Sequence, residues 1–206
     1  MSAGRFITLE GGEGAGKSTH AAFIRDWLQA RGREVLLTRE PGGSPLAEEI
    51  RRVVLQGWAE GVGAESEVLL MFAARAAHLR ATVLPALAAG RDVVCDRFVD
   101  SSYAYQGAGK GLDERHIAAL ESLVLGDFRP QLTLVFDLPP EQGLARARGR
   151  GEVNRFEDES LAYMARVREC FLRRAAAGGA RYQVIDAAPP LEQVRESLRL
   201  ALESRL

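Results

Sequence analysis

The sequence contains little cysteine: its 206 residues include two, Cys95 and Cys170, and neither belongs to a C-x-x-C pair. Isolated thiols argue against a zinc site and favour a reducing compartment. The formal net charge is -1, so no strong attraction to nucleic acid or to a membrane surface is expected. No apolar run approaches the ~20 residues that span a bilayer, and residues 1–9 are too short and too polar for a signal peptide. We therefore expect a soluble, cytoplasmic protein with no nucleic-acid or membrane partner.

Five short apolar segments are spaced along the sequence, at residues 6–9, 35–37, 93–95, 132–136 and 182–185. Each is apolar throughout rather than alternating, which is typical of strands buried on both faces. Helical periodicity is found between them, near residues 17–31, 45–54, 65–89, 117–124, 161–177 and 191–202. Strands that alternate with helices predict an α/β fold: a single domain over residues 1–206, with a five-stranded parallel sheet and helices on both faces.

Charged residues follow every predicted strand at its carboxyl end: Glu10, Arg39 with Glu40, Asp96 with Arg97, Asp137, and Asp186. The carboxyl ends of parallel strands meet at one edge of the sheet, where open α/β sheets bind their ligands. We therefore expect the functional site at this edge.

Residues 11–18 read G-G-E-G-A-G-K-S, which fits the P-loop pattern G-x-x-x-x-G-K-[ST] between a predicted strand and a predicted helix. Glycines let backbone N–H groups turn toward a phosphate chain, and the N-terminus of the next helix favours negative charge. Lys17 can reach the β- and γ-phosphates, and the Ser18 hydroxyl can bind Mg²⁺. The predicted nucleotide-binding residues are Gly11, Gly12, Glu13, Gly14, Ala15, Gly16, Lys17, Ser18 and Thr19.

Asparagine is almost missing, and this narrows the class of P-loop protein. A GTPase usually carries D-x-x-G and N-K-x-D. Here no aspartate has a glycine three residues later, and the single asparagine, Asn154, is not followed by lysine. A motor or helicase would normally need a longer chain. A small-molecule kinase is the favoured interpretation, and a nucleotide-dependent switch without an acceptor is the alternative from another class.

Several further motifs share their order and spacing with one family. They are T-R-E-P-G-G at 38–43, F-A-A-R at 72–75, D-R-F at 96–98, Y-Q-G at 105–107 and G-D-F-R-P at 126–130. Together with the P-loop, they make nearly the whole chain resemble bacterial thymidylate kinases. The resemblance implies a three-layer P-loop NTPase sandwich, a homodimer, and transfer of phosphate from ATP with Mg²⁺ to thymidine monophosphate. A kinase for another (deoxy)nucleoside monophosphate is the alternative.

The resemblance implies a role for charged residues around the phosphates. Arg97 is expected on the acceptor phosphate, which a planar guanidinium can hold with two hydrogen bonds. Arg39 is a second candidate for that phosphate, and Arg51 on the next helix is a weaker one. Asp96 and Ser18 are the expected Mg²⁺ residues. Glu13 is placed near the acceptor 3′-hydroxyl, and the catalytic set is Lys17, Arg97, Arg150 and Glu13.

The resemblance also implies which residues hold the acceptor nucleotide. The expected set is Arg39, Phe72, Arg75, Arg97, Ser102, Tyr105 and Gln106. Phe72 would stack on thymine, Arg75 would bind its carbonyl edge, and Tyr105 would crowd the 2′ position of the sugar. Many relatives have F-x-x-x-R where this chain has F-x-x-R, so Met71 occupies the expected aromatic position. A core position for Phe72 therefore stays open.

Arginines alternate with small residues in R-A-R-G-R-G at 146–151. Glycines between arginines fit a mobile lid, at about 143–155, that closes over the triphosphate. The variable positions of the P-loop carry no basic residue, so the arginine that stabilises the transition state must come from elsewhere. The resemblance places Arg150 first, ahead of Arg146 and Arg148, and an ordinary solvated helix end is the alternative.

Overall fold

The computed structural model describes residues 4–148 and 160–206. Within them, one parallel sheet has the strand order β2-β3-β1-β4-β5. Its strands are β1 (Phe6–Gly11), β2 (Val35–Arg39), β3 (Asp92–Asp96), β4 (Leu132–Asp137) and β5 (Tyr182–Asp186). The five predicted strands are confirmed, each with ends that differ from the prediction by two residues or fewer.

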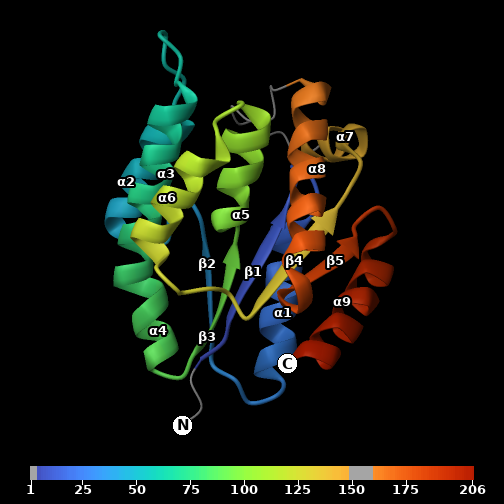
Figure 1. Cartoon of the computed structure of the whole chain (residues 1–206). Coiled ribbons are helices and arrows are strands. Elements are labelled where there is room, and N and C mark those ends of the chain that lie inside the picture. The colour runs from blue at the N-terminus through green and yellow to red at the C-terminus, as the bar shows by residue number, and fades with distance from the viewer. Residues whose placement is uncertain (1–3, 149–159) are drawn as a thin grey trace.

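Helices cover both faces of the sheet (Figure 1). They are α1 (Lys17–Gln29), α2 (Pro45–Leu55), α3 (Ala64–His78), α4 (Leu84–Ala88), α5 (Val99–Ser102), α6 (Glu114–Leu125), α7 (Pro140–Arg148), α8 (Leu161–Ala177) and α9 (Leu191–Arg205), with π-helical turns η1 (Leu79–Val83) and η2 (Tyr103–Gly109) and the 3₁₀ turn η3 (Gly179–Arg181). The predicted helix near 65–89 corresponds to α3, η1 and α4 in succession. The predicted three-layer α/β fold is confirmed.

The two faces of the sheet have separate hydrophobic cores. On one face, Ile24 of α1 and Leu198 of α9 pack with Ile7 and Leu134 of the sheet. On the other face, α3, α6 and α8 contribute Phe72, Ile117 and Val167 to a cluster with Phe6 and Val93. Burial of both faces explains why the inner strands β1, β3 and β4 are apolar throughout. The prediction of burial on both faces is wrong for the edge strands β2 and β5, which are only partly buried, because each has a neighbouring strand on one side alone.

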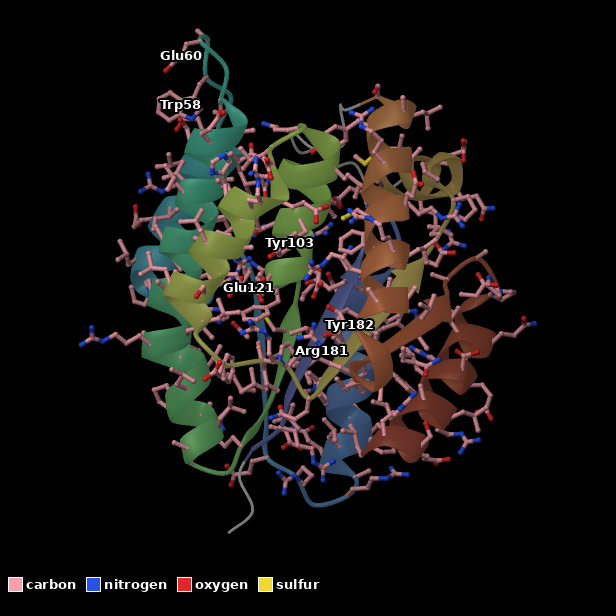
Figure 2. The ribbon with its side chains drawn as sticks, in the orientation of Figure 1. Trp58, Glu60, Tyr103, Glu121, Arg181 and Tyr182 are labelled. Carbon is pink, nitrogen blue, oxygen red and sulfur yellow. The ribbon has the colours of Figure 1, made fainter. Side chains whose placement is uncertain are left out.

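Several polar side chains between the elements on this second face of the sheet form hydrogen bonds. Figure 2 shows Tyr103 of η2 near Glu121 of α6, where the phenol donates to Oε2 at 2.8 Å. The Tyr182 hydroxyl at the start of β5 donates to Asp100 Oδ1 at 2.7 Å, and Arg174 of α8 donates to the same oxygen at 2.5 Å. These pairs compensate for the desolvation of polar groups between the helices.

One segment is longer and more apolar than the sequence analysis allowed. Among the described residues, the continuous helix Ala64–Ala88 has 25 residues, and an 18-residue window within it has a mean hydropathy of 1.3, enough by length and composition to cross a membrane. A core helix passes the same test, and 39% of this segment's most apolar window is buried inside the fold. The helix also carries Glu67 and Arg75, which are buried and paired with other elements of the domain. We therefore interpret it as a core helix.

A buried carboxylate joins the ends of the two central strands. Glu10 of β1 is 0% exposed, and it accepts hydrogen bonds from the Phe98 backbone N–H at 2.8 Å and the Ser101 hydroxyl at 2.6 Å. Burial, with Asp100 as the second cause, raises the pKa of Glu10 from 4.5 to about 7. The carboxylate thus fixes the turn after β3 at a cost in desolvation.

This raised pKa predicts a pH-dependent stability. Between about pH 4.5 and 7 the folded state holds a proton at Glu10 that the unfolded chain has released, so stability falls as pH rises. The fall should be on the order of 3 kcal/mol. Glu10→Gln should abolish it, as measured by urea unfolding at pH 5 and pH 8. The exposed Glu34→Gln serves as the control, and parallel curves for wild type and Glu10→Gln would contradict the prediction.

Candidate active site

The P-loop lies between the carboxyl end of β1 and the start of α1, as predicted. It packs tightly against the first turn of α7: a Cβ on Gly14 would lie 2.0 Å from the carbonyl oxygen of Gly143, and one on Gly143 would lie 2.4 Å from that of Glu13. Only glycine fits at both positions, because no side-chain carbon can approach a backbone oxygen so closely. The loop is therefore held in shape by backbone-to-backbone contact with α7.

Lys17 is the first residue of α1, and its side chain folds back over the loop. The ammonium donates to the carbonyl oxygens of Gly11 at 3.1 Å and Gly12 at 2.8 Å, and the residue is 7% exposed. Burial, and then the nearby Arg97, lowers the pKa of Lys17 to about 8. An anionic phosphate would oppose both effects, since it would add negative charge next to the buried ammonium.

Ser18 and Asp96 meet at the ends of α1 and β3. The Ser18 hydroxyl donates to Asp96 Oδ2 at 2.7 Å, while Asp96 Oδ1 is buried without a hydrogen-bond partner in the described part of the chain. Residues 4–148 and 160–206 contain no group of three or more His, Cys, Asp or Glu side chains that could enclose a metal. One hydroxyl and one carboxylate suit Mg²⁺, which usually takes one or two protein oxygens and completes its shell with phosphate and water.

Arg97 connects the P-loop to the neighbouring cavity. Its Nη1 donates to the Gly11 carbonyl at 3.0 Å and to the Ser101 hydroxyl at 3.2 Å, and its Nη2 donates to Glu13 Oε1 at 2.7 Å. The guanidinium also lies 4.8 Å from the ring centre of Tyr105. Burial alone would lower the pKa of Arg97, but surrounding negative groups, Glu13 first, raise it instead. Arg97 is thus a fixed cation at the border of two compartments.

The backbone of Arg97 is unusual, since its φ of 71° makes it the one described residue other than glycine with positive φ. Its N–H donates to the Leu9 carbonyl at 2.8 Å, and Glu10 binds the next N–H, that of Phe98. A left-handed conformation costs a side-chain-bearing residue about 1–2 kcal/mol. These two hydrogen bonds hold the conformation that turns the guanidinium toward the P-loop.

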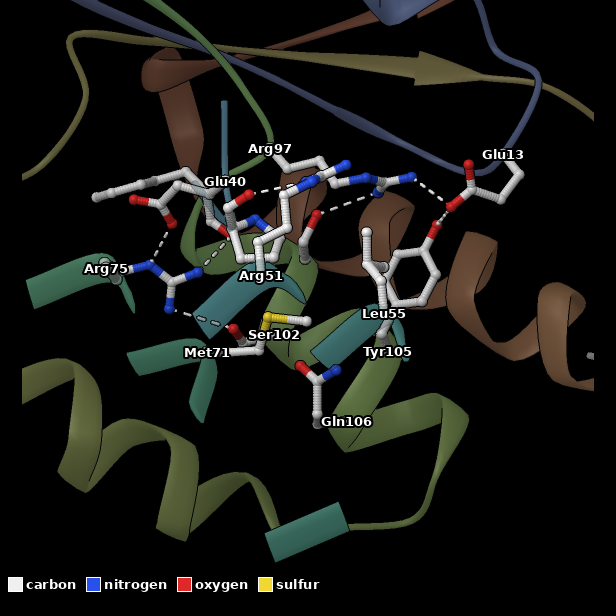
Figure 3. Close-up of a pocket in the computed structure, with 13 residues that line it drawn as sticks. Glu13, Glu40, Arg51, Leu55, Met71, Arg75, Arg97, Ser102, Tyr105 and Gln106 are labelled. Carbon is white, nitrogen blue, oxygen red and sulfur yellow. Dashed lines mark hydrogen bonds and ion pairs between the residues drawn. The ribbon is translucent and has the colours of Figure 1, made fainter. Parts of the chain in front are cut away.

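The cavity next to Arg97 lies between α2, α3 and the segment formed by α5 and η2 (Figure 3). Its lining residues are Glu13, Glu40, Pro41, Arg51, Leu55, Met71, Arg75, Arg97, Phe98, Ser101, Ser102, Tyr105 and Gln106. One end is therefore basic, and the other combines apolar side chains with a few polar groups, as sites for small organic anions do.

Most of the predicted acceptor residues meet in this cavity. Arg75, Ser102, Tyr105 and Gln106 line it together with Arg97. Tyr105 also donates its hydroxyl to Glu13 Oε1 at 3.2 Å. The sequence placed these residues on three separate segments, and the fold brings them together.

Two predicted residues lie elsewhere. Phe72 is 2% exposed and belongs to the core cluster, while its neighbour Met71 lines the cavity. Arg39 is exposed, pairs with Glu48 at 3.0 Å and does not line the cavity, whereas Arg51 does. The cavity is thus lined by Met71 and Arg51, whereas Phe72 and Arg39 lie outside it.

Arg75 is held rigidly at the far end of the cavity. Its Nε donates to Glu40 Oε2 at 2.7 Å, and its two terminal nitrogens donate to the Ser102 hydroxyl at 3.2 Å and the Phe98 carbonyl at 3.0 Å. His78 binds the other oxygen of Glu40 through Nδ1 at 3.0 Å. The sequence analysis named Glu40 only as a charged residue at a strand end and gave it no role, although its place in the T-R-E-P-G-G motif could have marked it as a partner for a buried arginine.

The expected lid falls largely outside the described residues. Arg150 and Arg155 lie there, and so does the side chain of Arg148. Arg146 is described: it donates to the carbonyls of Ala187 at 2.8 Å and Ala188 at 3.0 Å, in the turn after β5. Its guanidinium is therefore already engaged with the backbone of that turn.

Comparisons with known proteins agree with this geometry. The family model for thymidylate kinase matches residues 9–198. The thymidylate kinase of Pseudomonas fluorescens strain Pf-5 is 60% identical over 195 residues, which cover 95% of this chain and 93% of the relative. That of Alcanivorax borkumensis is 51% identical over 200 residues, or 97% and 96% of the two chains.

A solved structure supports the same assignment. The crystal structure of thymidylate kinase from Ehrlichia chaffeensis superposes with a TM-score of 0.79 at 31% identity, covering 98% of this chain and 99% of that one. The chain therefore belongs to the thymidylate kinase family and transfers a phosphoryl group from ATP to thymidine monophosphate.

Proposed function

We propose that thymidine monophosphate occupies the cavity beside Arg97 and that its phosphate faces the ATP phosphates held by the P-loop. The observation that carries this proposal is the position of Arg97, whose guanidinium contacts both the P-loop residue Glu13 and the cavity. Arg51 lines the same end, where burial, followed by the charges of Arg39 and Arg97, lowers its pKa. Cations placed this close together favour an anion between them.

Transfer in this arrangement needs charge neutralisation more than a base. The acceptor is a phosphate oxygen, and a phosphate monoester with a second pKa of about 6 is already mostly anionic at neutral pH. Lys17 and Arg97 would hold the facing phosphates in line and offset their repulsion. Glu13 would contact the sugar 3′-hydroxyl, and Tyr105 would crowd the 2′ position. Arg150 remains the proposed lid arginine, outside the described residues.

The proposed acceptor-phosphate contact can be tested with a matched pair of arginines. Arg51→Met should raise the KM for thymidine monophosphate about tenfold or more, because a charge-assisted contact is lost. Arg39→Met removes the same charge from an exposed position outside the cavity, so its KM should stay within about twofold. Steady-state kinetics with both variants give the answer. A larger KM effect for Arg39→Met would reverse the assignment.

We also propose that Mg²⁺ is bound with ATP at Ser18 and Asp96. The unpartnered, buried Oδ1 of Asp96 beside the Ser18 hydroxyl supports this site. There the ion would neutralise phosphate charge and help to orient the triphosphate.

Removing the carboxylate tests the metal site. Asp96→Asn should raise the Mg²⁺ concentration needed for half-maximal turnover about tenfold, because an anionic ligand or hydrogen-bond acceptor of metal-bound water is lost. The exposed Asp26→Asn on α1 controls for the loss of one charge. An unchanged Mg²⁺ dependence in a folded Asp96→Asn protein would place the metal elsewhere.

We further propose that the enzyme is a homodimer and works in the cytoplasm. The apolar face near α4 and α6 supports dimerisation: Leu84 is 45% exposed and Leu123 81%. A groove on this face is lined by Leu79, Leu84, Leu123 and Phe128, among others. Contiguous exposed apolar side chains mark protein interfaces. The two buried free thiols, Cys95 and Cys170, suit a reducing compartment.

A charge placed on this face should weaken the dimer. Leu123→Glu is expected to shift the protein from dimer to monomer, because the carboxylate would have to be desolvated at the interface. Leu200→Glu, on α9 against the opposite face of the sheet, is the matched control, since Leu200 is 54% exposed. Light scattering of both variants at the same protein concentration measures the effect. Dimers of equal stability in both would exclude this interface.

A further inference from the structure

A buried carboxylate lies behind the cavity and is not part of its lining. Glu67 of α3 is 0% exposed. Its Oε1 accepts a hydrogen bond from Gln106 Nε2 at 2.8 Å, and its Oε2 accepts one from Lys110 Nζ at 3.0 Å. Lys110 also donates to the Val62 carbonyl at 3.1 Å. Glu67 thus connects Lys110, which lies outside the cavity lining, to the side-chain amide of Gln106, which is part of it.

The chemistry of Glu67 decides which way the Gln106 amide points. An ionised carboxylate only accepts hydrogen bonds, so it must face the NH₂ end of the amide. Lys110 supplies the counter-charge that makes an ionised, buried Glu67 tolerable. The carbonyl oxygen of Gln106 therefore points away from Glu67, and Figure 3 shows this oxygen on the side of Met71.

This carbonyl oxygen has no hydrogen-bond partner in residues 4–148 and 160–206. Gln106 is 1% exposed and lines the cavity, and its Oε1 is buried without a hydrogen bond among the described residues. A buried unpaired acceptor costs free energy until a donor reaches it. Hydrogen-bond donors line the same cavity. Arg75 can only donate, and the Ser102 hydroxyl accepts a hydrogen bond from Arg75 and can donate its own proton.

The cavity thus offers an acceptor from Gln106 close to donors from Arg75 and Ser102. Thymine presents a ring N–H next to a carbonyl, which complements this arrangement. Cytosine presents a ring nitrogen acceptor next to an amino donor, so both of its groups would face groups of the same kind. A site built for one hydrogen-bonding polarity rejects the reverse polarity because buried groups are left unpaired.

We propose that Glu67, with its counter-ion Lys110, is a positioning residue that fixes the amide of Gln106 and so selects thymine over cytosine. This inference rests on the proposed placement of thymidine monophosphate in the cavity. Glu67 does not contact the base in this scheme. The oxygen and nitrogen ends of a glutamine amide are nearly equal in size, so the amide can adopt two orientations. Glu67 acts by excluding one of them.

The direct test is Glu67→Gln, which keeps the size of the side chain but can offer either a donor or an acceptor to Gln106. We expect the ratio of kcat/KM for thymidine monophosphate to that for deoxycytidine monophosphate to fall about tenfold or more. The loss should appear mainly as a higher KM for thymidine monophosphate, with kcat little changed, because the phosphates are untouched. Glu65→Gln, an exposed position on the same helix, is the control.

A double-mutant cycle separates positioning from a general structural effect. Gln106→Leu should lower the same ratio by itself. Adding Glu67→Gln to it should produce no further decrease, since the amide through which Glu67 acts is gone. If Glu67→Gln does not fold, Lys110→Met tests the same link and should also lower the ratio, and melting temperatures show which variants are folded.

The outcomes distinguish this inference from the proposed function. A wild-type enzyme without turnover of thymidine monophosphate would refute the function itself. If the wild type prefers thymidine monophosphate and folded Glu67→Gln or Lys110→Met keeps the full ratio, only the positioning role is refuted. Equal losses of rate with both nucleotides, or additive effects on the ratio in the double variant, would likewise refute it. A wild type that does not discriminate between the two nucleotides would also overturn the inference.

Discussion

The site depends on one largely enclosed cation, Arg97, whose side chain is 16% exposed, and on the constraints that hold it. The residue takes a left-handed conformation, with φ of 71°, at the turn after β3, where the Leu9 carbonyl binds its N–H and Glu10 binds the next one. In this position the guanidinium reaches both the P-loop and the cavity. If the turn relaxed, the two compartments would lose their shared charge. The free-energy cost of desolvating Glu10 thus maintains the geometry that phosphoryl transfer requires.

Two further buried carboxylates near the site, Glu40 and Glu67, are each held by a partner of opposite charge. Arg75 is bound to Glu40, and Lys110 is bound to Glu67. Such pairs add little net stability, because desolvation offsets their attraction. Their effect is to restrict orientation: Arg75 presents donors in one plane, and Gln106 presents one end of its amide. Preorganised groups of this kind give a small site its selectivity.

The long helix of α3, η1 and α4 illustrates how one segment can serve several purposes. Phe72 faces the core, Met71 and Arg75 face the cavity, and Leu84 faces outward. Together these demands favour apolar residues, so an 18-residue window of the segment is apolar enough by composition to pass for a membrane span. The high hydropathy of this helix is explained by its contributions to the core, to the cavity and to an exposed apolar face. The exposed apolar face is the proposed dimer interface.

The sequence by itself determined the P-loop, the five strands and the edge of the sheet that carries the site, because these depend on local patterns and on the direction of parallel strands. It also identified Arg97, Arg75, Ser102, Tyr105 and Gln106 through motif resemblance. Only the tertiary structure placed Met71 on the cavity and Phe72 in the core, since neighbours on a helix differ by about 100° in direction. It likewise separated Arg51 from Arg39 and revealed Glu67, because contacts between distant segments leave no periodic signal in the sequence.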